Sequence, residues 1–527
     1  MSSDFITTGL SRYAPLFLGA GLTAYLTWRW VEAGKVRIFN SGSENSKYAL
    51  LIKKCRSAES YWPSLLGIHA ALELIPFMYI GSLKSNRLDY AVEEVEMEDG
   101  ELLQIVWYKC DKTGRGGIPT HDEISETPIV MLHHGFMCHA NDLPGQGYIR
   151  QGLDKGWIVC ALNRRGHVGQ RLLKVPKFHI FGSTSDVRAI THFIRRTKRP
   201  AAPIYTIGFS AGSGLVAKLL GEQGQSLTEA SHPSFINGGI CITPGYNIEK
   251  CMGRITWPYS QVLLQRAKKF FLHRNRSILK DVPGYHDMDQ TQCLQSFLDH
   301  SYAMGGYSSK EEMYKKTNPM ATIEYVRAPA LIINSENDPL CTMDNVLENL
   351  AVFQRSEGAT LLLTKVGSHG PFYEFSFDPF RFDCWAERVS YEFLEEIQCS
   401  RAEEAKSTMS TTADCSSSPA GSSHMPGSPD VCSAHAGSPI GPCSASNPNP
   451  NPNPNPNPNP NPSPSPSPTR PCAAMSVDVT SPTSFTSPTS FTSPTSFTSP
   501  TSFTSPTSFS QPTATWSTVK SPLPKTP

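Results

Sequence analysis

The segment YTIGFSAGSGL, Tyr205 to Leu215, places glycines and serines directly after a short apolar run. It contains a G-x-S-x-G pattern, formed by Gly208, Ser210 and Gly212. An ordinary glycine-rich turn would have this composition. The alternative is a tight turn from a strand into a helix, which exposes the central serine hydroxyl for attack on a carbonyl carbon. The two glycines are then required because the turn leaves no room for side chains on either side of the serine.

Short apolar runs alternate with helical patterns along the chain. Continuous apolar runs of this length are typical of strands buried on both faces. Amphipathic segments separate several of them, for example STSDVRAITHFIRR at 183–196. This alternation predicts an α/β fold, with a mostly parallel central sheet flanked by helices. The runs are TPIVMLHHG, GWIVCALNRRG, APIYTIGFS, FINGGICITPG, APALIINSEND and ATLLLTKVGSH.

Two further segments complete the expected globular part. Residues 89–109 alternate apolar and polar positions on both sides of Asp99-Gly100, which predicts an antiparallel hairpin at the edge of the sheet. Residues 246–319 contain the basic and aromatic stretch RAKKFFLHRNRSILK and no strand pattern. We expect this insertion to form a helical cap over the carboxyl ends of the strands, where ligands bind in such sheets. A plain helical layer would fit the same pattern.

A serine nucleophile needs a base and an orienting acid, because a free hydroxyl reacts poorly at neutral pH. Asp338 follows a predicted strand in ALIINSENDPL, and His369 follows the next one in LLLTKVGSHGPF. With Ser210 they give the order Ser, Asp, His at the carboxyl ends of candidate strands. Each residue taken alone fits a turn or a surface loop equally well. We therefore interpret the three together as a catalytic triad, with Glu336 as the alternative acid.

Charge that develops on a substrate oxygen must be stabilised by backbone N–H groups. The residue after the nucleophile, Ala211, supplies one of them. The loop LHHGFMC supplies the second, from Phe136 or Met137, because Gly135 permits a close backbone approach. His134 is expected either to hold this loop or to pack at the strand end. This chemistry requires no metal and no cofactor.

Composition narrows the possible partners. The chain has 527 residues and a formal net charge of +1. It has no long basic run, so we expect no nucleic-acid partner. Its 14 cysteines include no C-x-x-C pair, and Cys160 and Cys241 fall inside predicted core strands. This cysteine usage favours a reducing compartment.

The segment from 405 to 527 is rich in Ser, Thr, Pro and Gly. It contains eight Asn-Pro pairs from Asn447 to Pro462 and five copies of TSPTSF that end at Phe509. A chain of this composition cannot bury enough apolar surface to offset the entropy of ordering it. We predict a disordered tail that acts as a spacer. A tail that serves as a scaffold for unidentified partner domains is the alternative.

The N-terminal segment at 5–30 is apolar. Arg12 is its only charged residue between Phe5 and Trp28. A helix of this length would cross a bilayer, so we expect a single-pass membrane anchor, although a signal sequence or an interfacial helix has a similar pattern. Arg29, Lys35 and Arg37 follow the apolar stretch that ends at Trp28, and the positive-inside rule then predicts a domain that faces the cytosol.

Between Tyr61 and Ile397 the chain resembles the α/β-hydrolase-domain esterases and lipases related to YheT, a group that includes membrane-anchored members. The resemblance rests on the Ser, Asp and His positions, on NRRGH at 163–167, on FGSTSDVRAITHFI and on YSSKEEMYKKTNP at 307–319. The loop HHGFMC departs from the Pro-Gly start of many relatives. The resemblance implies an α/β-hydrolase domain at 61–400, with Ser210 as nucleophile, His369 as base and Asp338 as acid.

Together these patterns predict a serine hydrolase that cleaves carboxylic esters, such as acylglycerols or phospholipids, at a membrane. Acyl transfer on the same triad is an alternative, although no H-x-x-x-x-D signature occurs. A non-catalytic protein that binds a hydrophobic ligand is another.

Overall fold

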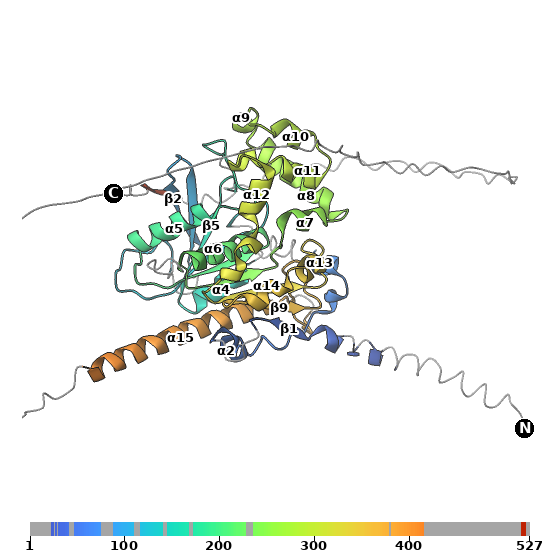
Figure 1. The fold of residues 1–527 in the computed structure, drawn as a ribbon. Coiled ribbons are helices and arrows are strands. Elements are labelled where there is room, and N and C mark those ends of the chain that lie inside the picture. The colour runs from blue at the N-terminus through green and yellow to red at the C-terminus, as the bar shows by residue number, and fades with distance from the viewer. Residues whose placement is uncertain are drawn as a thin grey trace, which may run out of the picture. The chain divides into compact units, whose positions relative to one another are not determined.

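The computed structural model describes most of the first 415 residues and one short segment near the end (Figure 1). The described ranges are 30–41, 47–74, 88–109, 116–140, 145–167, 172–227, 236–378, 381–415 and 518–522, with single residues between 20 and 28. Most of the predicted anchor at 5–30 lies outside them. Within them, no helix has both the length and the apolar character needed to cross a bilayer.

A twisted sheet of ten strands forms the centre of the molecule, in the order β1-β9-β8-β7-β6-β4-β5-β3-β2-β10. The six strands from β4 to β9 are mutually parallel, and they correspond to the six apolar runs of the sequence. The predicted mostly parallel sheet is therefore confirmed. The strands are β1 (Val36–Phe39), β2 (Tyr90–Glu96), β3 (Leu102–Tyr108), β4 (Ile129–His133), β5 (Ile158–Asn163), β6 (Ile204–Phe209), β7 (Gly238–Ile242), β8 (Ala330–Ser335), β9 (Ala359–Thr364) and β10 (Thr518–Pro522).

Antiparallel pairing occurs on both sides of the parallel centre, where β3 pairs with β5 and β1 pairs with β9. Strands β2 and β3 form the predicted hairpin, with Glu96 opposite Leu102 and Gly100 at a φ of 82°. On the other edge β1 runs antiparallel to β9. Sequence patterns had not identified β1, because a strand of four residues with two exposed side chains has little periodicity.

Helices cover both faces, and alternate residues of each central strand point to opposite sides. On one face, Val130 and Leu132 pack with helices α2, α4 and α15. On the other face, Ile129 and Met131 pack with α5 and α6. The bounds are α2 (Lys47–Lys54), α4 (Gln146–Asp154), α5 (Thr184–Thr197), α6 (Ala211–Leu227), α13 (Met343–Leu347), α14 (Leu350–Arg355) and α15 (Trp385–Cys415), with short helices η1 (Leu65–Ile68), η5 (Pro319–Ala321) and η6 (Ile323–Tyr325).

Residues 246–319, all of them described, contain helices and no strand. They lie between β7 and β8 and have their own apolar core, which includes Phe271, Leu272 and Phe297. Phe178 and Met137, which lie outside this range, also enter this core. The helices are α7 (Ile248–Gly253), α8 (Tyr259–Ala267), η3 (Lys268–His273), α9 (Arg276–Leu279), α10 (Tyr285–Gln290), α11 (Leu294–Asp299), η4 (Ala303–Gly305) and α12 (Lys310–Thr317). We call this part the cap.

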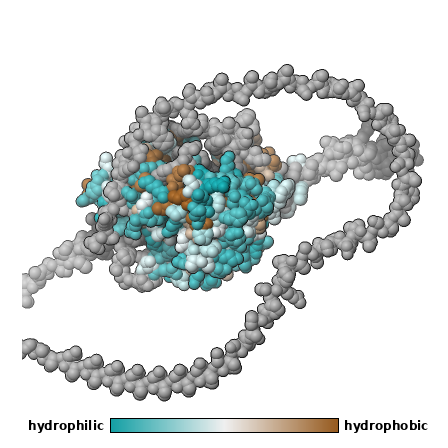
Figure 2. Space-filling view, turned by 90° about the horizontal axis from the view of Figure 1, so that it is seen from above, coloured by the Kyte–Doolittle hydropathy of each residue, from teal (hydrophilic) through white to brown (hydrophobic). Residues whose placement is uncertain are grey.

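Two elements fall within the segment predicted as a tail. Helix α15 continues past residue 405 to Cys415, and its segment RAEEAK at 401–406 consists of strong helix formers. Strand β10 pairs in parallel with β2. The remainder of 405–527 lies outside the described residues. The described surface seen from above is largely hydrophilic, with hydrophobic residues in small patches (Figure 2).

Candidate active site

The turn between β6 and α6 is as tight as the glycine pattern predicts. A Cβ atom on Gly208 would lie 2.4 Å from the carbonyl oxygen of Gly212, and one on Gly212 would lie 2.3 Å from the carbonyl oxygen of His133. Both contacts are with backbone, which cannot move aside. Ser210 itself has a φ of 51°, an uncommon conformation for a residue with a side chain. The turn thus holds Ser210 in a strained, fixed position.

Three side chains predicted from distant parts of the chain meet at the carboxyl ends of the strands. The Nε2 atom of His369 lies 2.9 Å from the Oγ of Ser210, and its Nδ1 lies 2.8 Å from Oδ2 of Asp338. The Asp338 carboxylate is fully buried, and its other oxygen accepts hydrogen bonds from the N–H groups of Leu340 and Cys341 at 2.8 and 2.9 Å. These contacts fix the carboxylate and orient the imidazole between it and the hydroxyl.

The alternative acid, Glu336, lies elsewhere. Its carboxylate is partly exposed and forms an ion pair with Arg37. Glu336 and Asp338 follow the same strand, but only Asp338 reaches His369.

The loop that carries His369 is fastened to the end of β8. Ser335 donates a hydrogen bond from its Oγ to the carbonyl of Ser368 at 2.6 Å, and the Asn337 side chain accepts one from the Ser368 N–H at 2.8 Å. Ser368 has a φ of 52°, so the loop is a tight turn just before the histidine. These bonds hold the imidazole at the height of Ser210.

A second buried cluster holds the loop after β4. The guanidinium of Arg164 donates to the carbonyls of His134 and Gly135, at 2.8 and 3.0 Å. The His134 ring is within 3.0 Å of the Gly135 carbonyl and 3.4 Å of the Arg164 N–H, which fits a neutral ring with the proton on Nδ1. Burial and the adjacent guanidinium hold the pKa of His134 well below its usual range. Burial also lowers the pKa of Arg164 to about 9.

This arrangement sets the direction of the candidate oxyanion donors. Because the Gly135 carbonyl is bound to Arg164, the peptide that follows it has a fixed orientation. Phe136 and Ala211 both line the cavity above Ser210. Met137 is buried in the core of the cap and is not among the lining residues. Of the two loop residues, Phe136 is therefore the better placed.

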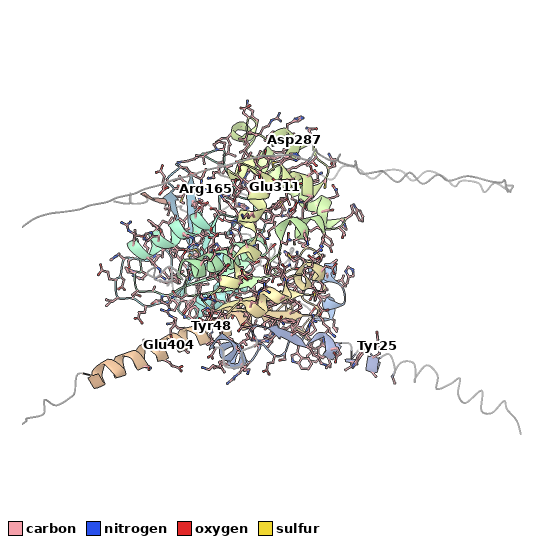
Figure 3. All side chains as sticks on the ribbon, in the orientation of Figure 1. Tyr25, Tyr48, Arg165, Asp287, Glu311 and Glu404 are labelled. Atoms are coloured by element: carbon pink, nitrogen blue, oxygen red, sulfur yellow. The ribbon has the colours of Figure 1, made fainter. Side chains whose placement is uncertain are left out.

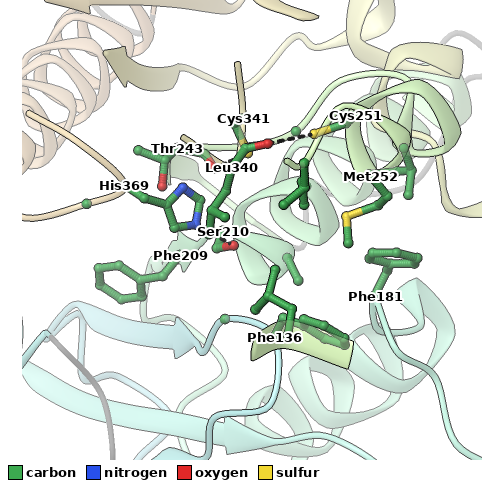
Figure 4. A pocket seen from close by; sticks show the side chains of 18 of the residues that line it. Phe136, Phe181, Phe209, Ser210, Thr243, Cys251, Met252, Leu340, Cys341 and His369 are labelled. Carbon is green, nitrogen blue, oxygen red and sulfur yellow. Dashed lines mark hydrogen bonds between the residues drawn. The ribbon is translucent and has the colours of Figure 1, made fainter. Parts of the chain in front are cut away.

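An apolar cavity of about 180 Å³ opens above Ser210 and His369. Figure 4 shows the His369 ring beside Ser210, with Met252 and Phe181 on the opposite side. None of the described lining residues carries a carboxylate or an ammonium group. Most of the wall consists of Phe136, Phe181, Phe209, Ile242, Ile248, Met252, Ile255, Leu263 and Leu340. We call it the apolar cavity.

Asp338, Cys341 and His369 bring possible metal ligands within 4.8 Å of one another. Their present partners argue against a metal site. The Cys341 thiol donates to the carbonyl of Thr243 at 3.4 Å, and the neighbouring Cys251 together with burial raises the pKa of that thiol. A metal ligand would have to be the thiolate, so the donor set fits a triad better than an ion.

Arg164 is the residue of the site that pattern analysis missed as a functional residue. Arg164 lies within NRRGH at 163–167, and an arginine after a strand carries no signal of its own. The adjacent Arg165 makes a bidentate contact with Asp186, at 2.8 and 3.1 Å, which ties the same loop to α5. The one sequence signal for this role is the pair Arg164-Arg165, which lies between the end of β5 and Gly166.

Several known proteins are similar to part of this chain. Residues 125–375 match the family model described as serine aminopeptidase, S33. The chain is similar to Protein ABHD15 of Homo sapiens, with 26% identity over 290 residues, 53% of this chain and 58% of that protein. Phospholipase ABHD3 of Homo sapiens is 22% identical over 288 residues, 54% of this chain and 68% of that protein. Putative esterase YheT of Escherichia coli is 19% identical over 253 residues, 47% of this chain and 69% of that protein.

The chain thus spans about 58% of the length of the first of these relatives. Among solved structures, an acylaminoacyl peptidase in complex with Z-Gly-Gly-Phe-chloromethyl ketone is 17% identical, covers 61% of this chain and 43% of that chain, and has a TM-score of 0.35. The Pyrococcus furiosus esterase Pf2001 is 16% identical, covers 54% of this chain and 85% of that chain, and has a TM-score of 0.32.

Proposed function

We propose that this chain, which has the sheet order of an α/β-hydrolase fold and matches the serine aminopeptidase, S33 model over residues 125–375, is a serine hydrolase that cleaves carboxylic esters of lipids. The observation that carries the proposal is the unbroken chain of two hydrogen bonds from Ser210 through His369 to Asp338. It lies beneath a cavity with an apolar wall.

In the first half of the reaction, the Ser210 Oγ attacks the ester carbonyl carbon. The Nε2 of His369 takes the hydroxyl proton, and the buried Asp338 carboxylate stabilises the imidazolium that forms. The ester C–O bond then breaks, and His369 returns the proton to the leaving alcohol. In the second half, water attacks the acyl-enzyme with His369 again as the base, and the free acid leaves.

The negative charge on the tetrahedral intermediate would be stabilised by the N–H groups of Ala211 and Phe136. Arg164 contributes indirectly, because it fixes the carbonyl that precedes the Phe136 amide. Arg164 is thus proposed as a positioning residue.

The wall of the apolar cavity supports an acyl chain as the bound group. A substrate with a free amino terminus would need a carboxylate to bind it, and no described lining residue supplies one. Two relatives are named as a phospholipase and a monoacylglycerol lipase, which supports acylglycerols or phospholipids as the substrate class.

The test is labelling by a fluorophosphonate probe, combined with hydrolysis of a lipid ester. Ser210→Ala should lose both the label and turnover, while its thermal unfolding stays near that of the wild type. Ser226→Ala on the exposed side of α6 is the matched control and should keep both. Normal turnover in Ser210→Ala would contradict the proposed function.

Membrane association through residues 5–30 is part of the proposal. It rests on the apolar composition of that segment. Carbonate extraction of membranes should retain the full chain and release a variant that lacks residues 1–30. Release of both would contradict it.

A further inference from the structure

A second cavity, of about 380 Å³, lies between the start of α5, α6 and the cap. Its lining differs from that of the apolar cavity. Three lysines line it, Lys177, Lys218 and Lys316, with Glu222 as the one acid among the described lining residues. Helices α5 and α12 border this cavity. In Figure 3 they can be found from two labelled residues, Arg165, which contacts α5, and Glu311, which lies on α12. We call it the basic cavity.

The N-terminus of α5 borders this cavity. Ser183, Thr184 and Ser185 line it, and the Ser183 side chain does not cap the helix. The Ser183 hydroxyl instead lies 2.6 Å from that of Ser185. The free N–H groups at the start of a 14-residue helix carry partial positive charge and favour an anion.

An independent sign of a ligand is His179. Its side chain lines the basic cavity, is only 8% exposed, and its Nδ1 atom has no hydrogen-bond partner. Burial lowers the pKa of His179 to about 4, so the ring is neutral and one nitrogen can donate a hydrogen bond. Leaving a buried polar atom unpaired costs about 1–3 kcal/mol, so a buried ring without a hydrogen bond at Nδ1 is unusual.

The lysines are not equally engaged. Lys218 pairs with Glu222 at 3.0 Å, and Lys316 pairs with Glu312 at 2.6 Å. Lys177 has no ion pair among the described residues, and its side chain extends along Gly306. Among the described residues, Lys177 is thus the one lysine of the lining without an ion pair, and we expect it to be the lysine that contacts a ligand.

We propose that the basic cavity binds a phosphate-type oxyanion, through Lys177, His179 and the first turn of α5. Phe181 lines both this cavity and the apolar cavity, so the two sites adjoin. A molecule with a phosphate group and an acyl chain would fill both. That extension rests on the proposed function, whereas anion binding itself does not.

The experiment measures binding to the full chain carrying Ser210→Ala, so that it needs no catalytic activity. Isothermal titration with inorganic phosphate, sn-glycero-3-phosphocholine and glycerol compares the free anion, the lipid headgroup and a phosphate-free control. Phosphate-containing ligands should bind and glycerol should not. Tighter binding of the phosphocholine ester would identify a lipid headgroup as the natural ligand, and the reverse order would identify free phosphate.

Lys177→Gln should weaken binding of the preferred phosphate ligand about tenfold, the usual effect of losing a charge-assisted hydrogen bond. Lys174→Gln, an exposed lysine three residues away, is the matched control and should change binding less than twofold. His179→Phe keeps a ring in the buried space and should also weaken binding. Equal loss in both lysine variants would overturn the proposal, as would no phosphate binding to the parent protein.

Discussion

The apolar and basic cavities adjoin at Phe181 but differ in how their polar groups are satisfied. Beneath the apolar cavity, the Asp338 carboxylate has three partners and His369 has two. In the basic cavity, the Nδ1 of His179 has none. A satisfied network keeps reacting groups in place before substrate arrives, whereas unsatisfied donors indicate a group that the ligand must supply. The difference supports the proposal that the first cavity carries out the chemistry and the second binds an anion.

The largest effect should come from breaking the satisfied network. Asp338→Asn keeps the shape of the side chain but removes the charge that stabilises the imidazolium, and kcat should fall by about 10⁴. Glu336→Gln, two residues away and paired with Arg37 on the surface, should change kcat by less than twofold. Similar losses of kcat from the two substitutions would contradict the role of the Asp338–His369 hydrogen bond in catalysis.

Glu73 is a buried acid close to the satisfied network and is itself poorly satisfied. It faces the Gly367 N–H and the Asn337 side chain, yet neither carboxylate oxygen makes a full hydrogen bond. Burial raises its pKa to about 7. Between pH 4.5 and 7 the folded chain therefore holds a proton that the unfolded chain has lost.

The contribution of Glu73 to the free energy of unfolding should thus be full below pH 4.5 and be lost as the pH rises through 7, by a total on the order of 3 kcal/mol. Glu73→Gln keeps a neutral side chain, so it should remove this part of the pH dependence. Denaturant unfolding at a series of pH values measures it. An unchanged pH dependence in the variant would mean that Glu73 titrates normally.

Substitution of Arg164 tests whether the proposed oxyanion donor at Phe136 depends on the hydrogen bonds from Arg164 to the loop after β4. Lysine retains the charge but cannot donate to both carbonyls in the same geometry. Arg164→Lys should lower kcat by about 10², because one oxyanion donor would be misplaced. KM should change little. Arg188→Lys, an arginine paired with Glu222 away from Ser210, should leave kcat within twofold. A rise in KM with an unchanged kcat would instead point to a role in substrate binding.

The smallest expected effect comes from narrowing the apolar cavity, which should lower activity on long-chain esters only. Met252→Trp fills part of the apolar cavity, so kcat/KM for a long-chain ester should fall about tenfold while that for an acetate ester stays within twofold. Phosphate binding in the Ser210→Ala background should be unaffected. A parallel loss for both esters would place the acyl chain outside this cavity.

Local sequence was sufficient for the six central strands, the β2–β3 hairpin and the serine turn. Buried parallel strands appear as continuous apolar runs, and the close approach between Gly208 and Gly212 excludes any larger residue. The edge strand β1 and the continuation of α15 to Cys415 were not foreseen. Both depend on which neighbour the segment packs against, and single-sequence patterns do not carry that information.

The sequence by itself determined which residue types occur and the order Ser, Asp, His along the chain. Only the tertiary structure decided between Asp338 and Glu336, because their difference is the direction of a side chain after one strand. It alone also assembled the basic cavity from 177–185, Lys218 and 305–317. The physical reason is that hydrogen bonds and ion pairs act over a few ångströms in space, while sequence separation does not limit them.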